Sequence, residues 1–162
     1  MKKILTTIAA LVALSATSAY ANDPKATIAA LDARLAKIGE AKTEGTDKAG
    51  ELMVPGLYFG TRKLNNNYDV VDEIKKSTGA TATVFVKQGD EFVRVSTNVL
   101  TPEGKRGVGT TLAKAKAYEA VSQGSLFCGT VDVLGTPFDA CYNAIKDKGG
   151  KVIGASYIGF KK

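Results

Sequence analysis

The sequence of 162 residues contains no histidine, no tryptophan and only two cysteines. Without imidazole, a Ser–His–Asp triad, a histidine-based zinc site and histidine ligation of haem iron are all excluded. The cysteines, Cys128 and Cys141, lie too far apart in the sequence for a redox CxxC motif. We therefore expect no metal site and no cofactor.

Signatures of catalysis are equally scarce. Asp132, Asp139 and Asp147 show no spacing that marks an acid/base pair. The glycine-rich stretch at residues 104–110 lacks the strand–loop–helix context and the Lys-Ser/Thr of a phosphate-binding loop. We expect a binding protein and no enzyme.

Charge of one sign is only mildly in excess. The formal net charge is +6, and no basic stripe with interleaved aromatic residues occurs, so nucleic acid is not an expected partner. A mild positive excess is compatible with a small anionic ligand, and it also simply favours solubility.

The N-terminus has the three parts of a secretory signal peptide. Lys2 and Lys3 are followed by an apolar run at residues 4–14 and by a small-residue stretch that ends with Ala19 and Ala21. The alternative, a membrane anchor, needs roughly 20 apolar residues, and this run is shorter. We predict cleavage between Ala21 and Asn22. The bacterial style of this segment makes the periplasm the expected location.

Cleavage at this position leaves 141 residues, the size of one domain, with a net charge of +4. We divide the chain into a signal peptide at 1–21, an N-terminal helix with a polar linker at 22–48, and the main domain at 49–162. No second apolar run is long enough to cross a membrane, so the cleaved chain is not expected to span one.

The pattern of apolar residues predicts an α+β domain. Pro24 begins a helix that ends near Gly39, and residues 40–48 are polar and expected to be loose. Further helices are expected at residues 68–76 and 111–122. Strands are expected at 80–87, 91–99, 126–134, 138–145 and 152–160. Their hairpin-length connections predict an antiparallel sheet of about five strands.

Within the strand at 91–99, apolar and polar residues alternate. This pattern places Arg94, Ser96 and Asn98 together on one polar face.

The two cysteines are symmetric about a predicted turn at Leu134-Gly135. If a hairpin turns there, Cys128 and Cys141 lie opposite each other, with Cα atoms about 4.5–5.5 Å apart, which a disulfide can bridge. An oxidising compartment favours this bond, which would stabilise the fold by roughly 3 kcal/mol. Two free buried thiols are the alternative.

Several stretches of the sequence resemble single Cache domains of the Cache 3/Cache 2 fusion type. The similarity runs from about residue 50 to the C-terminus. The stretches are Tyr58-Phe59-Gly60, Leu64-Asn65-Asn66-Asn67-Tyr68-Asp69-Val70-Val71-Asp72, Thr78-Gly79-Ala80-Thr81-Ala82-Thr83-Val84-Phe85, Asp90-Glu91-Phe92-Val93-Arg94-Val95-Ser96-Thr97-Asn98-Val99 and Gly154-Ala155-Ser156-Tyr157-Ile158-Gly159-Phe160.

This resemblance implies a PAS-like fold, with a central antiparallel sheet, an N-terminal helix across one face and a ligand pocket on the other. It also implies an extracytoplasmic sensory role. Cache domains usually sit between the transmembrane helices of receptors and kinases, whereas this chain looks like a standalone exported form. A second departure lies at Tyr142-Asn143-Ala144, where the family often has Tyr-Glu-Pro. That change either alters the pocket or straightens the strand.

Arg94 is the first candidate ligand-binding residue, because a guanidinium can hold a carboxylate through two parallel hydrogen bonds. Ser96 and Asn98 are the candidates beside it. The alternative is a structural ion pair of Arg94 with Asp132 or Glu119.

Two tyrosines complete the candidate site. Tyr142 offers a ring and a hydroxyl from the hairpin, and Tyr118 could close the pocket from its helix, although aromatic residues of this kind are often simply part of a core. The loop at Lys105-Arg106 either covers an anionic ligand or is a solvated turn.

The sequence therefore predicts a periplasmic sensor or ligand-binding module for a small organic molecule, carboxylate- or amino-acid-like. It would act in signal transduction or chemotaxis, with a membrane receptor or sensor kinase as a possible partner. The rival hypothesis is a ligand-free module that docks onto such an ectodomain. A cavity lined by Arg94 and Tyr142 would favour ligand binding, and one filled with side chains would favour docking.

Overall fold

The computed structural model describes residues 22–162. The predicted signal peptide at 1–21 lies outside this range, and its removal stays a prediction. Among the described residues, no helix has both the length and the hydrophobicity needed to cross a bilayer.

The described chain begins with helix α1 (Pro24–Ile38), as the sequence predicts. Asp23 precedes it and accepts a hydrogen bond from the backbone N–H of Ala26 at 3.1 Å, which satisfies one of the free amides of the first turn. Ile28, Leu31 and Leu35 lie on one face of the helix and are buried. This apolar face fixes α1 against the sheet.

The main sheet has five antiparallel strands, which confirms the predicted α+β class. Its spatial order is β5-β4-β8-β7-β6. The strands are β4 (Thr81–Gln88), β5 (Glu91–Thr97), β6 (Phe127–Val133), β7 (Thr136–Lys146) and β8 (Val152–Lys161). Since β4 and β8 are far apart in sequence yet adjacent in the sheet, the two halves of the chain are joined at its centre.

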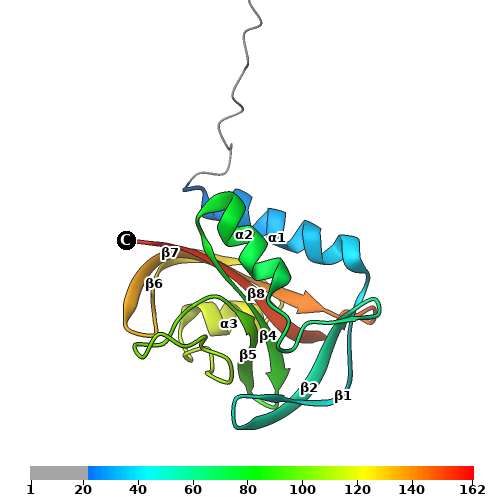
Figure 1. The fold of residues 1–162 in the computed structure, drawn as a ribbon. Coiled ribbons are helices and arrows are strands. Elements are labelled where there is room, and N and C mark those ends of the chain that lie inside the picture. Colours follow the sequence, from blue (N-terminus) through cyan, green and yellow to red (C-terminus); the bar gives the residue numbers. More distant parts are fainter. Residues whose placement is uncertain (1–21) are drawn as a thin grey trace, which may run out of the picture.

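Two helices cover one face of this sheet and one helix covers the other (Figure 1). Helix α1 crosses β7 and β8, and α2 (Asp69–Thr78) lies beside it over β4. On the opposite face, α3 (Lys116–Ser122) packs on β6 and β7. Two hydrophobic clusters result, one on each side of the sheet. The expected arrangement of an N-terminal helix on one face is therefore present.

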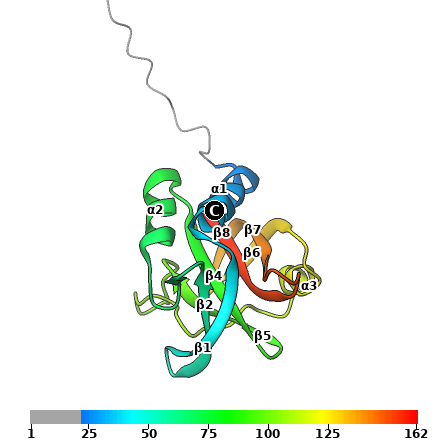
Figure 2. The same ribbon diagram turned by 90° about the vertical axis from the view of Figure 1, so that its right-hand side faces the viewer.

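A second, three-stranded sheet was not predicted. It contains β1 (Ala41–Ala49), β2 (Leu52–Phe59) and β3 (Arg62–Lys63), and it extends below the main sheet in Figure 2. The expectation of a loose linker at residues 40–48 is therefore wrong. That segment is a strand paired with β2, and it is polar because most of its side chains face solvent.

Helix α3 is also shorter than the predicted helix at 111–122. Residues 109–112, which we call the edge segment, instead run along the outer edge of β5. The N–H groups of Gly109 and Leu112 donate to the carbonyls of Arg94 and Phe92, each at 2.9 Å. These long-range hydrogen bonds override the local helical preference of the sequence.

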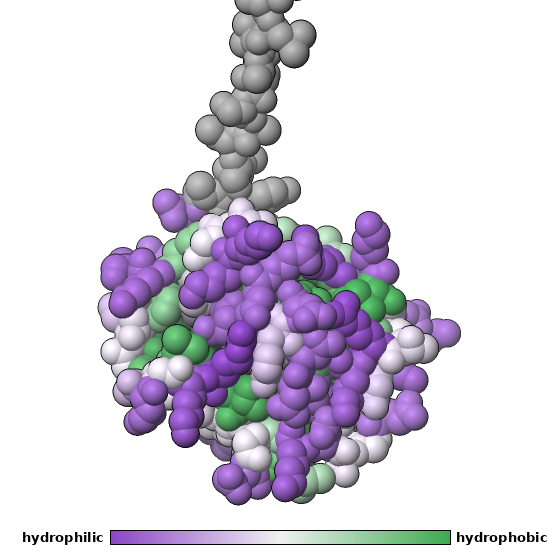
Figure 3. Space-filling model, viewed as in Figure 1, coloured by the Kyte–Doolittle hydropathy of each residue, from purple (hydrophilic) through white to green (hydrophobic). Residues whose placement is uncertain are grey.

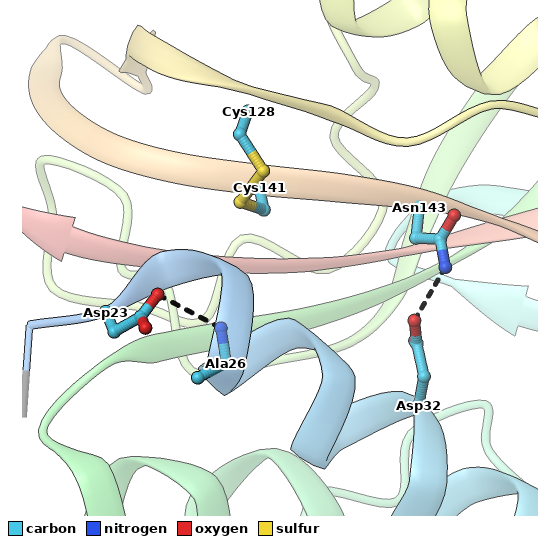
Figure 4. The surroundings of a disulfide bond; sticks show 6 residues. All are labelled: Asp23, Ala26, Asp32, Cys128, Cys141 and Asn143. Atoms are coloured by element: carbon cyan, nitrogen blue, oxygen red, sulfur yellow. Dashed lines mark hydrogen bonds between the residues drawn. A yellow bond between two sulfur atoms is a disulfide. The ribbon is translucent and has the colours of Figure 1, made fainter. Parts of the chain in front are cut away.

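The hairpin of β6 and β7 turns at Leu134-Gly135, as predicted, and both residues have positive φ. Cys128 is paired with Cys141 across the two strands, and a disulfide joins them with a Cα–Cα distance of 4.1 Å. This confirms the predicted bond, which ties the edge strand β6 to the sheet beside the start of α1 (Figure 4).

Hydrophilic side chains cover most of the face shown in Figure 3, and hydrophobic side chains are visible there only in small separate areas. Among residues 22–162, the large hydrophobic side chains that are exposed are Leu52, Met53, Leu100 and Leu126.

Candidate functional site

A β-bulge decides where the side chains of β5 point. The register between β4 and β5 shifts between Val84, which faces Ser96, and Phe85, which faces Arg94. One extra residue, Val95, therefore separates the two pairs, and side chains on either side of it turn to opposite faces of the sheet. The polar face expected for Arg94, Ser96 and Asn98 is divided by this bulge.

Arg94 lies on the α3 side of the sheet and is almost completely buried, with 4% of its surface exposed. Its Nη1 donates to Oγ1 of Thr110 at 2.9 Å and to the carbonyl of Thr111 at 3.2 Å, so the edge segment holds the guanidinium. The guanidinium carbon lies 4.9 Å from the centre of the Phe85 ring. Burial lowers the pKa of Arg94 from its usual value, yet an arginine in a protein stays charged at neutral pH.

No carboxylate of the described residues neutralises this cation. Among residues 22–162, no acidic group lies within 4.0 Å of the guanidinium, and Nε is buried without a hydrogen-bond partner. Asp132, one of the expected structural partners, instead accepts a hydrogen bond from the Gly135 N–H at 2.9 Å. Glu119, the other, forms no ion pair with Arg94 either.

Beside Arg94 lies a cavity of about 520 Å³. Arg94 and Tyr142 line it as buried polar residues. Its charged lining residues other than Arg94 are Lys116 and Asp132, which are exposed and so belong to its solvent side. The remaining walls are mostly apolar and come from the edge segment, α3 and the β6–β7 hairpin: Leu112, Ala117, Phe127, Val131, Val133 and Leu134.

Tyr142 is 1% exposed, and its ring centre lies 6.3 Å from that of Phe85 and 4.8 Å from that of Tyr157. Burial raises the pKa of Tyr142 to about 12, so its hydroxyl is protonated at neutral pH and can donate a hydrogen bond. Tyr157 is buried as well, and its hydroxyl lies 3.2 Å from Oγ1 of Thr81. The structure thus brings Arg94 and Tyr142 to one cavity.

The other candidates lie elsewhere. Ser96 donates to the carbonyl of Asn67 at 2.6 Å, on the α2 side of the sheet. Asn98 donates to the carbonyl of Val71 at 2.7 Å and accepts from the N–H of Ala82 at 2.8 Å. Ser96 at the end of β5 and Asn98 just after it therefore connect this part of the chain to the segment that contains α2.

Tyr118 does not line the cavity. Its hydroxyl donates to the carbonyl of Asp90 at 2.6 Å, and its ring packs edge-on against Phe92 at 5.7 Å. The adjacent residues Lys116 and Ala117 line the cavity in its place.

The loop before the edge segment is fixed to α2. Arg106 forms two hydrogen bonds of 2.8 Å with the carboxylate of Asp72, donates to the carbonyl of Thr97 at 2.9 Å, and lies 4.3 Å above the Tyr68 ring. Its guanidinium holds the pKa of Asp72 below the usual range. Lys105 is exposed. Arg106 thus has a structural partner and does not line the Arg94 cavity.

Asn143, which departs from the usual family sequence, points away from this cavity. It lies on the α1 face of β7, where its amide donates to Oδ2 of Asp32 at 2.7 Å (Figure 4). Ser156 donates to Oδ1 of the same carboxylate at 2.5 Å, and burial raises the pKa of Asp32. The pairing of β7 with β8 is regular through Asn143 and Ala144. The asparagine at this position therefore serves to connect α1 to the sheet, through its hydrogen bond to Asp32.

The sequence signal that could have revealed the edge segment is its one glycine, Gly109. At Gly109, φ is +86°, and a Cβ atom would lie 2.5 Å from the carbonyl oxygen of Ala49. Only glycine permits that close approach. Among the described residues, no group of acidic or cysteine side chains is arranged to hold a metal ion.

Comparison with known protein families finds a match to the Cache 3/Cache 2 fusion domain over residues 5–162. Comparison with curated proteins finds no significant match. Cache domains are generally extracellular sensor modules that bind small molecules. Because the match covers nearly the whole sequence and the fold has the expected layers, the chain belongs to the Cache 3/Cache 2 fusion domain family.

Proposed function

We propose that this Cache domain is a periplasmic sensor that binds a small organic anion, carboxylate- or amino-acid-like, in the cavity beside Arg94. A membrane receptor or sensor kinase would recognise the ligand-bound form, and the domain would act in signal transduction or chemotaxis. The location rests on the predicted signal peptide, and the sensory role rests on the family.

The observation that supports ligand binding is the buried guanidinium with no acidic partner beside an open cavity. Burying an unpaired charge costs folding free energy. Features that cost stability in this way are expected at functional sites. An anionic ligand would supply the missing partner.

The rival hypothesis, ligand-free docking, predicts a space filled by side chains. Instead, Arg94 and Tyr142 both border about 520 Å³ of open volume. This favours ligand binding over docking.

A thermal-shift screen with organic acids, amino acids and amines tests the proposal. A ligand present at 100 times its Kd stabilises the folded state by about 2.7 kcal/mol, which is a shift of several degrees in Tm. We expect anions to produce this shift in the wild type and not in Arg94→Gln.

The matched control is Arg62→Gln, because Arg62 pairs with Asp69 outside the cavity. Mass spectrometry of protein purified without denaturation is the second measurement and should identify a retained anion. The absence of any shift and of any retained molecule would refute the proposal.

A further inference from the structure

Arg94 and Tyr142 define the polar end of the cavity. Nη1 of Arg94 is already bound to the edge segment, and Nε is buried with almost no accessible surface, so neither is open to a ligand. Nη2 makes no hydrogen bond to any of residues 22–162, and neither does the hydroxyl of Tyr142. Together these two groups can donate to the two oxygens of a carboxylate. The site therefore offers a place for one carboxylate.

The size and the walls of the cavity define the remainder of the ligand. A volume of about 520 Å³ lies in the range of pockets that enclose small organic molecules, roughly 300–1,000 Å³. A two-carbon acid would leave most of this space to water. The apolar walls from α3 and the β6–β7 hairpin favour an apolar body, because its burial contributes about 25 cal/mol for each Å².

An α-amino acid would place its ammonium group at the wrong end. The ammonium is attached to the carbon next to the carboxylate, so it would lie near Arg94. Among the described residues that line the cavity, the one carboxylate is that of Asp132, which is exposed and already accepts a hydrogen bond from the Gly135 N–H. An ammonium beside a buried guanidinium, without an acid, would lose hydration and be repelled.

A second carboxylate on the ligand would also gain little. Lys116 is the other cation that lines the cavity, and it is exposed. Solvent and salt weaken interactions with an exposed charge.

From these observations we infer that the cavity selects monocarboxylates with an apolar body about the size of a phenyl ring, and discriminates against α-amino acids. This inference rests on the ligand-binding function proposed above and narrows it to one chemical class.

Isothermal titration calorimetry with four probes tests the inference: 3-phenylpropionate, L-phenylalanine, 3-phenylpropanamide and acetate. Phenylalanine has the skeleton of phenylpropionate with an added ammonium, and the amide has a similar shape but replaces the carboxylate by a neutral group with one acceptor oxygen and an NH2 donor. We expect phenylpropionate to bind at least about tenfold more tightly than each of the other three. Arg94→Gln should abolish this preference, and Arg62→Gln should retain it.

A second variant, Ala117→Leu, covers the case in which Arg94→Gln fails to fold. Ala117 is buried and lines the apolar wall, so a leucine there reduces the space for the phenyl ring. It should weaken phenylpropionate binding at least about tenfold and leave any binding of acetate unchanged.

The outcomes separate the inference from the proposed function. If phenylalanine or acetate binds as tightly as phenylpropionate and the binding depends on Arg94, the inference is wrong and the proposed function stands. If none of the probes binds but the wider thermal-shift screen finds another Arg94-dependent ligand, the inference is again wrong and the proposed function again stands. If the wider screen also finds nothing, both are wrong.

Discussion

Thr110 accepts a hydrogen bond from Nη1 of Arg94 at 2.9 Å and donates its own hydroxyl hydrogen to the carbonyl of Gly107 at 2.6 Å. A hydroxyl has one hydrogen, so the bond to Gly107 leaves only lone pairs of Thr110 directed toward Arg94. The guanidinium is thereby held by an acceptor of fixed orientation, and Nη2 stays available to a ligand.

Replacing Thr110 should show how much the orientation of Arg94 contributes to ligand affinity, because the charge of Arg94 is kept. Thr110→Val keeps the shape and removes the acceptor, so we expect the affinity for the anionic ligand to fall by about tenfold and the free energy of unfolding to fall by about 1–2 kcal/mol. Thr110→Ser keeps the hydroxyl and should bind like the wild type. Calorimetry on folded samples of both variants measures the difference. Equal affinity in the valine and serine variants would show that Thr110 does not position Arg94.

Arg94 itself should contribute little to the stability of the unliganded protein. Since the guanidinium is buried without an acid, Arg94→Met replaces a desolvated charge by an apolar chain of similar length. We expect the free energy of unfolding to stay within about 1 kcal/mol of the wild type or to rise. Urea unfolding measures it. A loss above about 2 kcal/mol would indicate that the bonds to Thr110 and Thr111 make Arg94 mainly structural.

The pair of Asp72 and Arg106 should depend on pH. The pKa of Asp72 is lowered in the folded state, chiefly by its hydrogen bonds to Arg106. A carboxyl with a depressed folded pKa stabilises the fold above its unfolded pKa of about 3.9, and this contribution is lost as the pH falls through the lower folded value. Both side chains are more than a third solvent-accessible, so about 1 kcal/mol at pH 7 is a reasonable expectation.

Urea unfolding of the wild type and of Asp72→Asn between pH 7 and pH 3 checks this expectation. The difference in unfolding free energy should be constant near neutral pH and shrink below about pH 4. Asp69→Asn serves as the control, because Asp69 pairs with Arg62 at the surface. A difference that stays unchanged down to pH 3 would contradict an electrostatic origin.

Local patterns predicted the helices α1 and α2 and the β6–β7 hairpin well. The cysteine register could be obtained from sequence because an antiparallel hairpin with a known turn fixes which residues face each other. Arg94 could be chosen because a charge in the middle of an apolar strand is unusual. These features depend on residues close together in the sequence.

The features that the sequence does not predict depend on contacts between residues far apart in the sequence. The bulge opposite Val84 and Phe85 leaves the alternation of β5 unchanged in the sequence, yet it sends Ser96 to the face opposite Arg94. The polar strand β1 is stable because it pairs with β2, which its own composition does not indicate. The edge segment, likewise, follows β5 through backbone bonds that a local helical preference cannot reveal.

Export should produce a chain that begins with Asn22. The small residues Ala19 and Ala21 fit the requirement of the signal peptidase. Mass spectrometry of the protein from a periplasmic fraction should therefore give the mass of residues 22–162. Ala21→Phe should accumulate the uncleaved precursor, while Ala21→Gly should be processed. A full-length mass for the wild type in that fraction would refute cleavage at this position.

Loss of the disulfide should affect both stability and ligand binding. Cys128 is exposed on the edge strand β6, and Cys141 is fully buried on β7. The residues lie 13 apart in the sequence, and closing a loop of about this length stabilises the fold by about 3 kcal/mol. The same strand supplies Phe127, Val131 and Val133 to the cavity wall.

The double variant Cys128→Ala/Cys141→Ala should thus unfold at a lower urea concentration, by an amount equal to about 2–3 kcal/mol, and bind the ligand more weakly. Reductant should lower the stability of the wild type and leave the double variant unchanged, which controls for general effects of the reagent. Unchanged ligand affinity in the double variant would show that the backbone hydrogen bonds between β6 and β7 suffice to hold the cavity wall. The disulfide would then act on stability alone, through the unfolded chain, since the loop it closes restricts that chain whether or not a ligand is bound.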